Sequence, residues 1–284
     1  MLGQLKHHIK KRLFTDVDES IQKNIQKFVR SIDREKIRQA KRPADFEGSI
    51  EIVIPCYNHG HFLPRALKSI RNQTYKKALT VTVVNDNSQD SSFEVMERLQ
   101  LENKTKNIDL NLINNDSGSN LKQFGALNLA IQGSKNKLFI TLNADDILTT
   151  DCLELIVETY KNNPSIYMLG GSSLWFKEGE KLPAHHAIRS QNLALTKYGP
   201  KDALQFNHLN SINMSQSSCS FFRVAWELVG GYFPPEKRVC SFDDRDFQMR
   251  VSSVLPVGVY QDYPMVYYSS DTSVSRTVEG HYDT

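Results

Sequence analysis

The sequence predicts an α/β protein with a mainly parallel central sheet, helices on both faces of that sheet, and a helical arm in front of it. The first observation is a set of short, apolar, β-branched segments typical of buried strands, at residues 50–54, 79–84, 109–113 and 137–141. The second is that residues with helical spacing separate these segments, and such alternation is typical of parallel sheets. The third is the arm, where apolar residues recur at helical spacing among basic ones, at Ile21, Ile25, Phe28 and Ile32.

The first two strands each run into a polar loop. Residues 50–54 meet Pro55, which lacks the N–H that a sheet ladder needs, so we expect the strand to end there. Residues 79–84 meet an acid-rich turn at residues 85–90, in which Asn87 can adopt left-handed backbone angles. After each of these loops, apolar residues recur at helical spacing, which predicts a helix.

Two adjacent acids, Asp145 and Asp146, come shortly after the strand at residues 137–141. The carboxyl ends of parallel strands are where open α/β sheets bind ligands. Adjacent carboxylates repel each other unless a cation is present, which favours oxygen-ligated Mg²⁺ or Mn²⁺. On this stretch alone, the alternative that both acids cap a helix beginning near Thr149 stays open.

A second acidic stretch lies far downstream, at residues 243–250. Asp243 and Asp244 can cap a helix there, while Asp246 and Arg250 have the i and i+4 spacing of a helical ion pair. Capping is compatible with catalysis, because a helix start is a rigid place to hold a carboxylate. The shared placement of these segments at strand ends favours one site over several unrelated turns.

Together these segments resemble an inverting glycosyltransferase of family 2 with the GT-A fold. I-V-I-P-C-Y-N-H-G is similar to that family's first strand and loop, V-V-N-D-N-S-Q-D to its acidic turn, and L-N-A-D-D to its Asp-x-Asp metal motif. Downstream, S-S-C-S-F-F-R, G-G-Y-F and D-D-R-D-F-Q-M-R resemble its acceptor-side signature. The resemblance extends approximately from Ser49 to Ser275, and the order of the motifs makes it specific.

The resemblance implies transfer of a sugar, with inversion, from a nucleoside diphosphate sugar to a hydroxyl of a glycan or lipid-linked acceptor. A UDP-sugar and a role in cell-surface or capsular polysaccharide synthesis are expected. Asp244 would be the catalytic base, with Asp243 raising its pKa, and Asp145 would be the main protein ligand of Mn²⁺ or Mg²⁺. The residues implied in binding donor or substrate are Pro55, Tyr57, Asn58, Asp86, Asn128, Asn143, Asp145 and Asp243.

The chain departs from the family's pattern in three places. Asn85 and Asn143 stand where the family often carries Asp, and residues 267–271 lack a late metal-binding His. Two alternatives to a glycosyltransferase stay open: a nucleotidyltransferase, and a non-catalytic GT-A-like binding module in a glycan-synthesis complex. A nucleotidyltransferase usually carries a Gly-rich phosphate loop with a basic residue after its first strand, and residues 55–60 provide neither.

Composition excludes several other classes. The 284 residues contain no apolar run long enough to span a bilayer and no signal-peptide core. The sequence has no Gly-x-Gly-x-x-Gly or Walker-type segment, which argues against dinucleotide and P-loop binding. The four cysteines include no Cys-x-x-Cys pair, and Cys56 is expected to be a small buried thiol. We expect a cytoplasmic enzyme, with peripheral contact to the inner membrane face left open.

The basic arm at residues 1–45 is expected to precede a GT-A domain at residues 46–284. Residues 1–42 hold 12 Lys and Arg against 5 Asp and Glu, a net charge of +7. A basic amphipathic helix of this kind can lie on an anionic membrane, bind a partner protein or pack on the enzyme itself, and these alternatives stay open. Nucleic acid is disfavoured as a partner because no aromatic stacking platform accompanies the charge.

Within the GT-A domain, residues 48–146 are expected to bind the nucleotide sugar and residues 147–284 the acceptor. The regular alternation of strands and helices fades after residue 148. Residues 170–208, which begin with Gly170-Gly171, are expected to be loop-rich and to shape the acceptor site.

Overall fold

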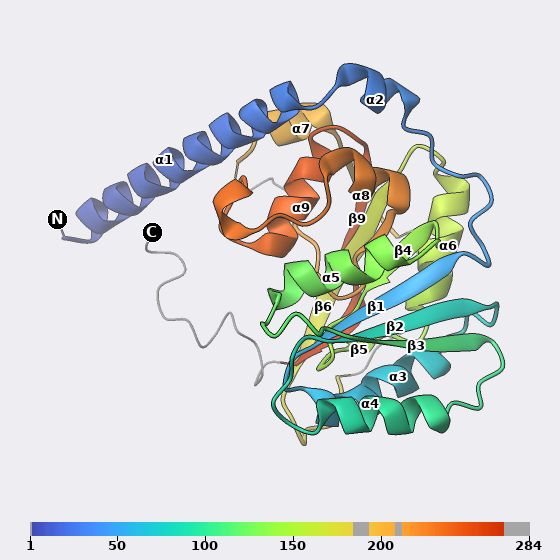
Figure 1. The fold of residues 1–284 in the computed structure, drawn as a ribbon. Helices are drawn as coiled ribbons and strands as arrows, with labels where there is room; N and C mark the ends of the chain where they lie inside the picture. The colour runs from blue at the N-terminus through green and yellow to red at the C-terminus, as the bar shows by residue number, and fades with distance from the viewer. Residues whose placement is uncertain (1, 184–192, 208–211, 270–284) are drawn as a thin grey trace.

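The computed structural model describes residues 2–183, 193–207 and 212–269, with the side chains of the first helix from residue 16 onward (Figure 1). The described strands form one nine-stranded sheet in the order β3-β2-β1-β4-β8-β6-β9-β5, with β7 paired to β9. The strands are β1 (Ile50–Cys56), β2 (Leu79–Asn85), β3 (Ile108–Asn114), β4 (Leu138–Thr141), β5 (Ile147–Leu148), β6 (Met168–Phe176), β7 (Thr196–Tyr198), β8 (Ser220–Phe222) and β9 (Val257–Ser269).

The strands β1 to β4 form the parallel half of the sheet, and they confirm the four predicted strands. β1 pairs in parallel with both β2 and β4, and β2 pairs in parallel with β3. The register places Cys56 beside Asn85 and Asn85 beside Asn114. Parallel strands point the same way, so the loops after them meet at one edge of the sheet, which is where the candidate site lies.

The structure corrects the expected end of β1. Pro55 and Cys56 belong to β1, where they pair with Val84 and Asn85. The pairing of β1 with β4 ends at Val53. Pro55 is tolerated because it lies beyond that ladder, where the strand is paired on the β2 side.

The other strands form a mixed half, in which β8 runs antiparallel to both β4 and β6. The expectation of a loop-rich segment from residue 170 was wrong for its first part, because β6 continues to Phe176 and pairs along β9. A Cβ on Gly170 would lie 2.7 Å from the Met214 sulfur, and one on Gly171 would lie 2.7 Å from the Tyr263 carbonyl oxygen. These glycines therefore permit close packing within a strand instead of starting a loop. Residues 184–192 and 208 of the expected loop-rich segment lie outside the described residues.

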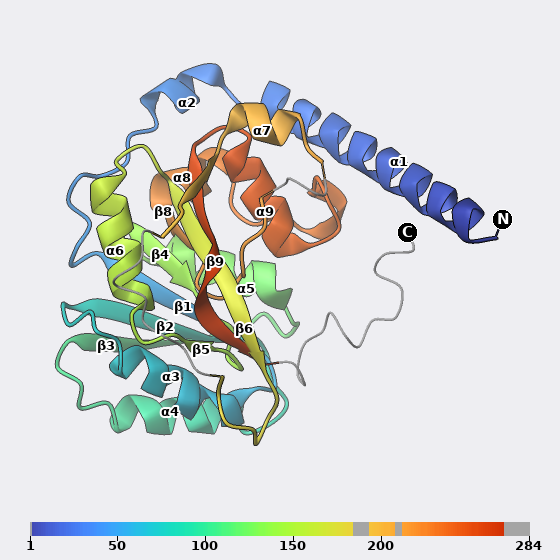
Figure 2. The same cartoon turned by 180° about the vertical axis from the view of Figure 1, so that it is seen from behind.

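Helices cover both faces of the sheet (Figures 1 and 2). One face packs against α3 (Leu63–Arg71), α4 (Ser92–Leu101) and α6 (Cys152–Asn162), and the 3₁₀ turn η1 (Gly60–Phe62) leads into α3. The opposite face packs against α5 (Lys122–Gly133), α8 (Arg223–Val229) and α9 (Asp243–Ser252), with the 3₁₀ turn η2 (Pro235–Lys237) between α8 and α9. The layers are those of the expected α/β fold, and the two clusters of buried apolar side chains lie on either side of the sheet.

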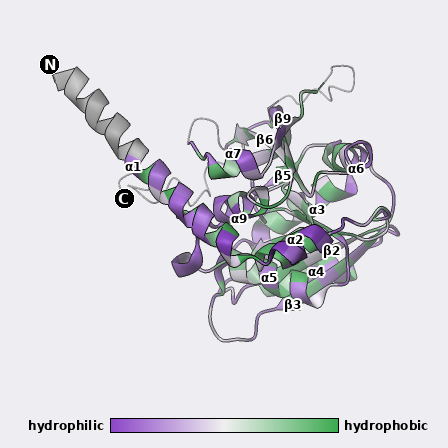
Figure 3. Ribbon diagram, turned by 90° about the horizontal axis from the view of Figure 1, so that it is seen from above, coloured by the Kyte–Doolittle hydropathy of each residue, from purple (hydrophilic) through white to green (hydrophobic). Residues whose placement is uncertain are grey.

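The arm consists of α1 (Leu2–Ser31) and α2 (Arg34–Gln39), and the second half of α1 packs on the body of the protein near α7 (Pro200–Leu204). Ile25 is fully buried. The Gln22 side-chain amide donates to the Phe206 carbonyl oxygen over 2.7 Å. Figure 3 shows hydrophobic and hydrophilic residues alternating along this part of α1. The apolar stripe thus contacts the protein's own surface, while contact with a membrane or partner stays a prediction.

Arg42 fastens the linker between the arm and β1. Its guanidinium donates to the carbonyl oxygens of Tyr160, Asn163 and Ile166 at 2.7–3.1 Å, around the end of α6. The Arg42 guanidinium carbon also lies 4.8 Å from the centre of the Phe222 ring. A cation at the carboxyl end of a helix interacts favourably with its carbonyl groups, so the linker is held in place.

Deleting residues 1–15 is expected to weaken binding to vesicles rich in phosphatidylserine, because these residues hold four Lys and Arg and no Asp or Glu. Each basic residue near an anionic surface contributes roughly 1 kcal/mol, and salt screens this attraction. Sedimentation at low and high salt measures the effect, with phosphatidylcholine vesicles as the uncharged control. Equal sedimentation of the intact and shortened chains would contradict a membrane role.

Within the described residues, no helix has both the length and the apolar character needed to cross a bilayer.

Candidate active site

The acid pair lies in the turn between β4 and β5, at the carboxyl edge of the parallel strands. The Asp146 N–H donates to the Asn143 carbonyl oxygen, which closes the turn. The helix that follows, α6, begins at Cys152 with Asp151 before it. The alternative in which Asp145 and Asp146 cap a helix near Thr149 is therefore wrong, because a short strand, β5, separates them from that helix.

Asp146 is the buried member of the pair and is 1% exposed. Its carboxylate accepts hydrogen bonds from the Ser217 hydroxyl, from the Ser269 N–H at 3.0 Å and from the Asn143 amide at 3.3 Å. Burial, followed by the negative charge of Asp145, raises the pKa of Asp146 to about 7. Asp146 thus joins the acid turn to the loop before β8 and to the end of β9, a structural role that the sequence did not reveal.

Asn143 and Arg65 support the acid turn from two sides. The Asn143 side-chain oxygen accepts from Gln123 at the start of α5 over 2.7 Å. Arg65, near the start of α3, donates to the backbone carbonyl of Asp145 and forms an ion pair with Glu178. Arg65 was not predicted from the sequence, since its partners lie about 80 and 113 positions away. It brings a positive charge to the turn that carries the predicted metal ligand.

Asp86 follows β2 and holds the loop between β3 and α5 through hydrogen bonds. It is 3% exposed, and its Oδ1 accepts from the Asn115 amide at 2.7 Å and from the Leu121 N–H at 2.8 Å. Asp86 therefore holds the loop between β3 and α5 in place. Neither Asn115 nor Leu121 was predicted as part of the site, because only the folded chain brings this loop beside β2.

The loops after β1 and β2 are tied together by Asn58. Its backbone N–H donates to the Ser88 hydroxyl at 3.0 Å, and its side-chain oxygen accepts from the Gln89 N–H at 2.7 Å. Asn58 and Asn87 both have positive φ angles, of 56° and 60°, which confirms the left-handed conformation expected at Asn87. Tyr57 beside them is 45% exposed, so its ring is accessible at the edge of the site.

The thiol of Cys56 is confirmed as a buried group. Cys56 is 1% exposed, and burial raises its pKa to about 11. A thiol with this pKa carries almost no thiolate at neutral pH, and the thiolate is the nucleophilic form.

Asp243 and Asp244 occupy the first turn of α9, after Phe242 at the N-cap position. The Asp244 carboxylate is partly buried and accepts from the Arg245 N–H at 2.7 Å. Burial, followed by the negative charge of Asp243, raises the pKa of Asp244 to about 6. The expected tuning of Asp244 by Asp243 therefore has a structural basis.

The turn at residues 216–219 lies between the two acidic regions. On one side, the Ser217 hydroxyl binds Asp146 and accepts from the Asn143 N–H at 3.0 Å. On the other, the charge of Asp244 adds to the burial that raises the pKa of Cys219. The acid turn and Asp244 are thus both near one short segment, and their joint action as a single site stays a prediction.

Asn128 has a different setting from the one expected. Its side-chain amide donates to the Tyr232 carbonyl oxygen at 2.8 Å, and its side-chain oxygen accepts from the Tyr232 N–H and the Trp226 indole at 3.0 and 3.1 Å. These bonds make Asn128 a support for the Gly230-Gly231-Tyr232 turn. A direct contact between Asn128 and a donor stays a prediction.

The family assignment follows from comparison with known proteins. A family model described as Glycosyl transferase family 2 matches residues 51–228. The chain is 29% identical over 130 residues to the GalNAc(5)-diNAcBac-PP-undecaprenol beta-1,3-glucosyltransferase of Campylobacter jejuni. This match covers 46% of this chain and 40% of that protein. It is 24% identical over 123 residues to a poly-beta-1,6-N-acetyl-D-glucosamine synthase of Staphylococcus epidermidis, over 43% of this chain and 28% of that protein. The matches thus span less than half the length of these relatives.

Solved structures show the same fold at low sequence identity. S. aureus TarS 1-349 in complex with UDP has a TM-score of 0.58 at 17% identity, over 78% of this chain and 60% of that one. The mannosyltransferase PcManGT from Pyrobaculum calidifontis, in complex with GDP-Man and Mn²⁺, has a TM-score of 0.58 at 15% identity, over 92% of this chain and 68% of that one. These similarities confirm the predicted GT-A fold. Since the family model covers more than half of its residues, the chain belongs to glycosyl transferase family 2.

Proposed function

We propose that the chain is an inverting glycosyltransferase that moves a sugar from a nucleoside diphosphate sugar, expected to be a UDP-sugar, to a hydroxyl of a glycan or lipid-linked acceptor. The observation that carries the proposal is Asp244, whose raised pKa of about 6 and position at the start of α9, near the 216–219 turn that binds Asp146, suit a general base. The names of the C. jejuni and S. epidermidis relatives support acceptors of this class and a role in cell-surface glycan synthesis.

The Asp244 carboxylate would remove the proton from the acceptor hydroxyl. A base with a pKa near 6 is mostly unprotonated at neutral pH, yet it is more basic than an ordinary Asp. The acceptor oxygen would then attack the anomeric carbon from the side opposite the diphosphate, which leaves with the electrons of the broken sugar–phosphate bond. One such displacement inverts the configuration.

Asp145 fits the protein part of a Mn²⁺ or Mg²⁺ site. Within the residues that the structure describes, no group of three or more His, Cys, Asp or Glu could hold a metal. Asp146 is engaged in three hydrogen bonds that join the acid turn to the rest of the fold. Asp145 is the carboxylate of the turn that the family resemblance implies as the metal ligand. One carboxylate combined with substrate phosphates is a common ligand set for Mg²⁺. When bound, the cation would neutralise charge on the departing diphosphate.

The donor's nucleoside would lie between the loops after β1 and β2, where Tyr57, Asn58 and Asp86 meet beside Pro55. Asp86 would accept from an N–H of the base, and the exposed ring of Tyr57 is suited to contact a planar base. Asn143 would bind the ribose or its neighbouring phosphate. The UDP complex of TarS is compatible with a uridine donor, and the GDP-Man complex of PcManGT shows that a guanosine donor also fits a protein of this fold.

Incubation with a panel of nucleotide sugars is expected to release nucleoside diphosphate in a reaction that needs Mn²⁺ or Mg²⁺. The released product separates the proposed function from its alternatives. Pyrophosphate would identify a nucleotidyltransferase instead. Binding of nucleotide sugars without any release, in the presence of glycan and lipid-linked acceptors, would favour the non-catalytic binding module.

A further inference from the structure

A buried ion pair lies behind the acidic first turn of α9. Asp246 and Arg250 are both 0% exposed, and the Arg250 Nε and one terminal nitrogen donate to Asp246 Oδ2 at 2.9 and 2.7 Å. The other terminal nitrogen donates to the Val229 carbonyl oxygen at 2.9 Å, while Asp246 Oδ1 accepts from the Val239 N–H at 2.7 Å. The pair therefore ties α9 to the end of α8 and to the loop before α9.

Side chains of α1 pack over the outer side of this ion pair. The Arg250 guanidinium carbon lies 3.7 Å from the centre of the Phe233 ring and 5.6 Å from that of Phe28. Phe28 meets Phe233 edge-on, with ring centres 6.3 Å apart. The Asn24 amide also donates to the Val239 carbonyl oxygen at 3.2 Å, so α1 contacts the same loop that binds Asp246.

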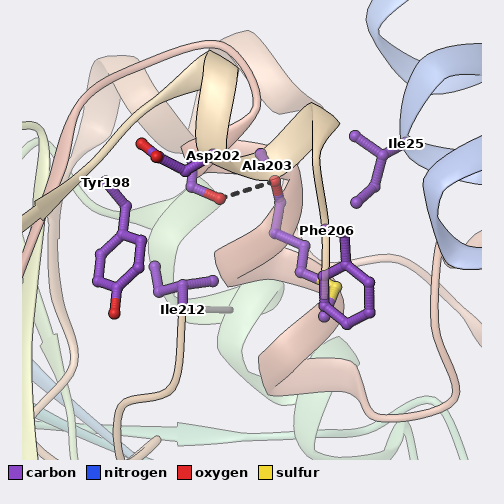
Figure 4. A pocket seen from close by; sticks show the side chains of 8 residues that line it. Ile25, Tyr198, Asp202, Ala203, Phe206 and Ile212 are labelled. Carbon is purple, nitrogen blue, oxygen red and sulfur yellow. Dashed lines mark hydrogen bonds between the residues drawn. The ribbon is translucent and has the colours of Figure 1, made fainter. Parts of the chain in front are cut away.

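The side chain of Ile25 adds an apolar contact on the same face of α1. Ile25 lies with Phe206, Ile212 and Met249 around a small pocket between α1, α7 and α9 (Figure 4). Met249 is next to Arg250 in α9 and is 1% exposed. Asn24, Ile25 and Phe28, which we call the α1 brace, therefore all contact α9 or a segment bonded to it.

We infer that the α1 brace positions Asp244 for catalysis; the inference rests on the proposed function. Asp246 lies two residues after Asp244 in the same helical turn. Charges buried as a pair are stable only while their geometry and their shielding from water persist. Loss of Phe28 would expose the Arg250 guanidinium and loosen the bonds that orient α9. A displacement of about 1 Å in a catalytic group can cost roughly 100-fold in rate, even when the mutation is distant.

The test compares Phe28→Ala with Gln26→Ala, which changes an exposed residue on the same helix. Phe28→Ala is expected to lower kcat for transfer roughly 10- to 100-fold while the KM for the donor changes little, and Gln26→Ala is expected to match the wild type. Hydrogen exchange should rise at the amides of residues 243–247 in Phe28→Ala alone. Phe28→Leu retains apolar cover and should recover most of the rate. If Phe28→Ala does not fold, Phe28→Val replaces it, and its kcat should lie between the value expected for Phe28→Ala and that of Phe28→Leu.

Unchanged kcat and unchanged exchange in α9, in a Phe28 variant with a lower melting temperature, would show that α1 is only a cover and would overturn the inference. The proposed function fails differently, through a wild-type chain that releases no nucleoside diphosphate from any donor. In that case hydrogen exchange still tests the α1 brace, because it needs no turnover.

Discussion

Replacing Asp244 with Asn is expected to lower the rate of glycosyl transfer by at least about 100-fold, because loss of a general base commonly costs 10²- to 10⁴-fold. Asn keeps the size of the side chain but cannot accept a proton. It can also still accept the hydrogen bond from the Arg245 N–H, so the start of α9 should persist. Donor affinity from calorimetry and kcat from nucleoside diphosphate release would separate binding from chemistry.

The neighbouring variant Asp243→Asn is the matched control and should be milder. The negative charge of Asp243 helps to raise the pKa of Asp244, so its removal should lower that pKa. In the wild type, the rate should fall as pH drops below about 6, where Asp244 becomes protonated. Asp243→Asn should move this acidic limb to lower pH. Normal transfer by Asp244→Asn combined with an inactive Asp243→Asn would assign the base to Asp243 instead.

Asp145→Ala is expected to abolish metal-dependent binding of nucleoside diphosphate and to leave the fold intact. The physical reason is the loss of the carboxylate proposed as the main protein ligand, for which the neighbouring Asn143 amide cannot substitute in charge. Calorimetry with and without Mn²⁺ measures the effect, and circular dichroism checks the fold. Unchanged affinity in the presence of the metal would rule out Asp145 as its ligand.

The adjacent variant Asp146→Ala should differ from Asp145→Ala, because its main effect should be on the stability of the fold. It removes the acceptor for the Ser217 hydroxyl, the Ser269 N–H and the Asn143 amide in a buried setting. A buried donor left without a partner costs about 1–3 kcal/mol. The free energy of unfolding should therefore fall by at least about 2 kcal/mol, as chemical denaturation would show. Equal effects of the two variants on stability would contradict the division of roles between these acids.

Local patterns predicted what depends on neighbours along the chain. The four parallel strands, the conformation of Asn87 and the Asp246–Arg250 pair all follow from the spacing of a few residues, and the structure confirms them. The carboxyl edge of a parallel sheet also follows from strand order, so the loop with Asp86 and the turn with Asp145 could be assigned to one edge.

Contacts between distant segments could not be predicted in this way. Asp146 binds Ser217 and Ser269, which are 71 and 123 positions away. A short sequence pattern cannot predict a contact between residues so far apart in the chain. Gly170-Gly171 was expected to begin a loop-rich segment, whereas both glycines lie in β6 and the missing Cβ atoms make room for Met214 and Met265. Packing also decides the setting of Asn128, whose partners belong to a turn about 100 residues downstream.

The helix α1 is unbroken over 30 residues, a rod roughly 45 Å long. Its second half is fixed to α9 and the Arg250 pair, and the first half extends beyond the body of the protein (Figure 1). Without a hinge between the halves, a surface held by the first half would fix the orientation of the whole domain above it. The distance and tilt of the acid turn relative to that surface would then follow from the length of α1 and from its fixed attachment to the domain, so the arm would limit which acceptors come within reach.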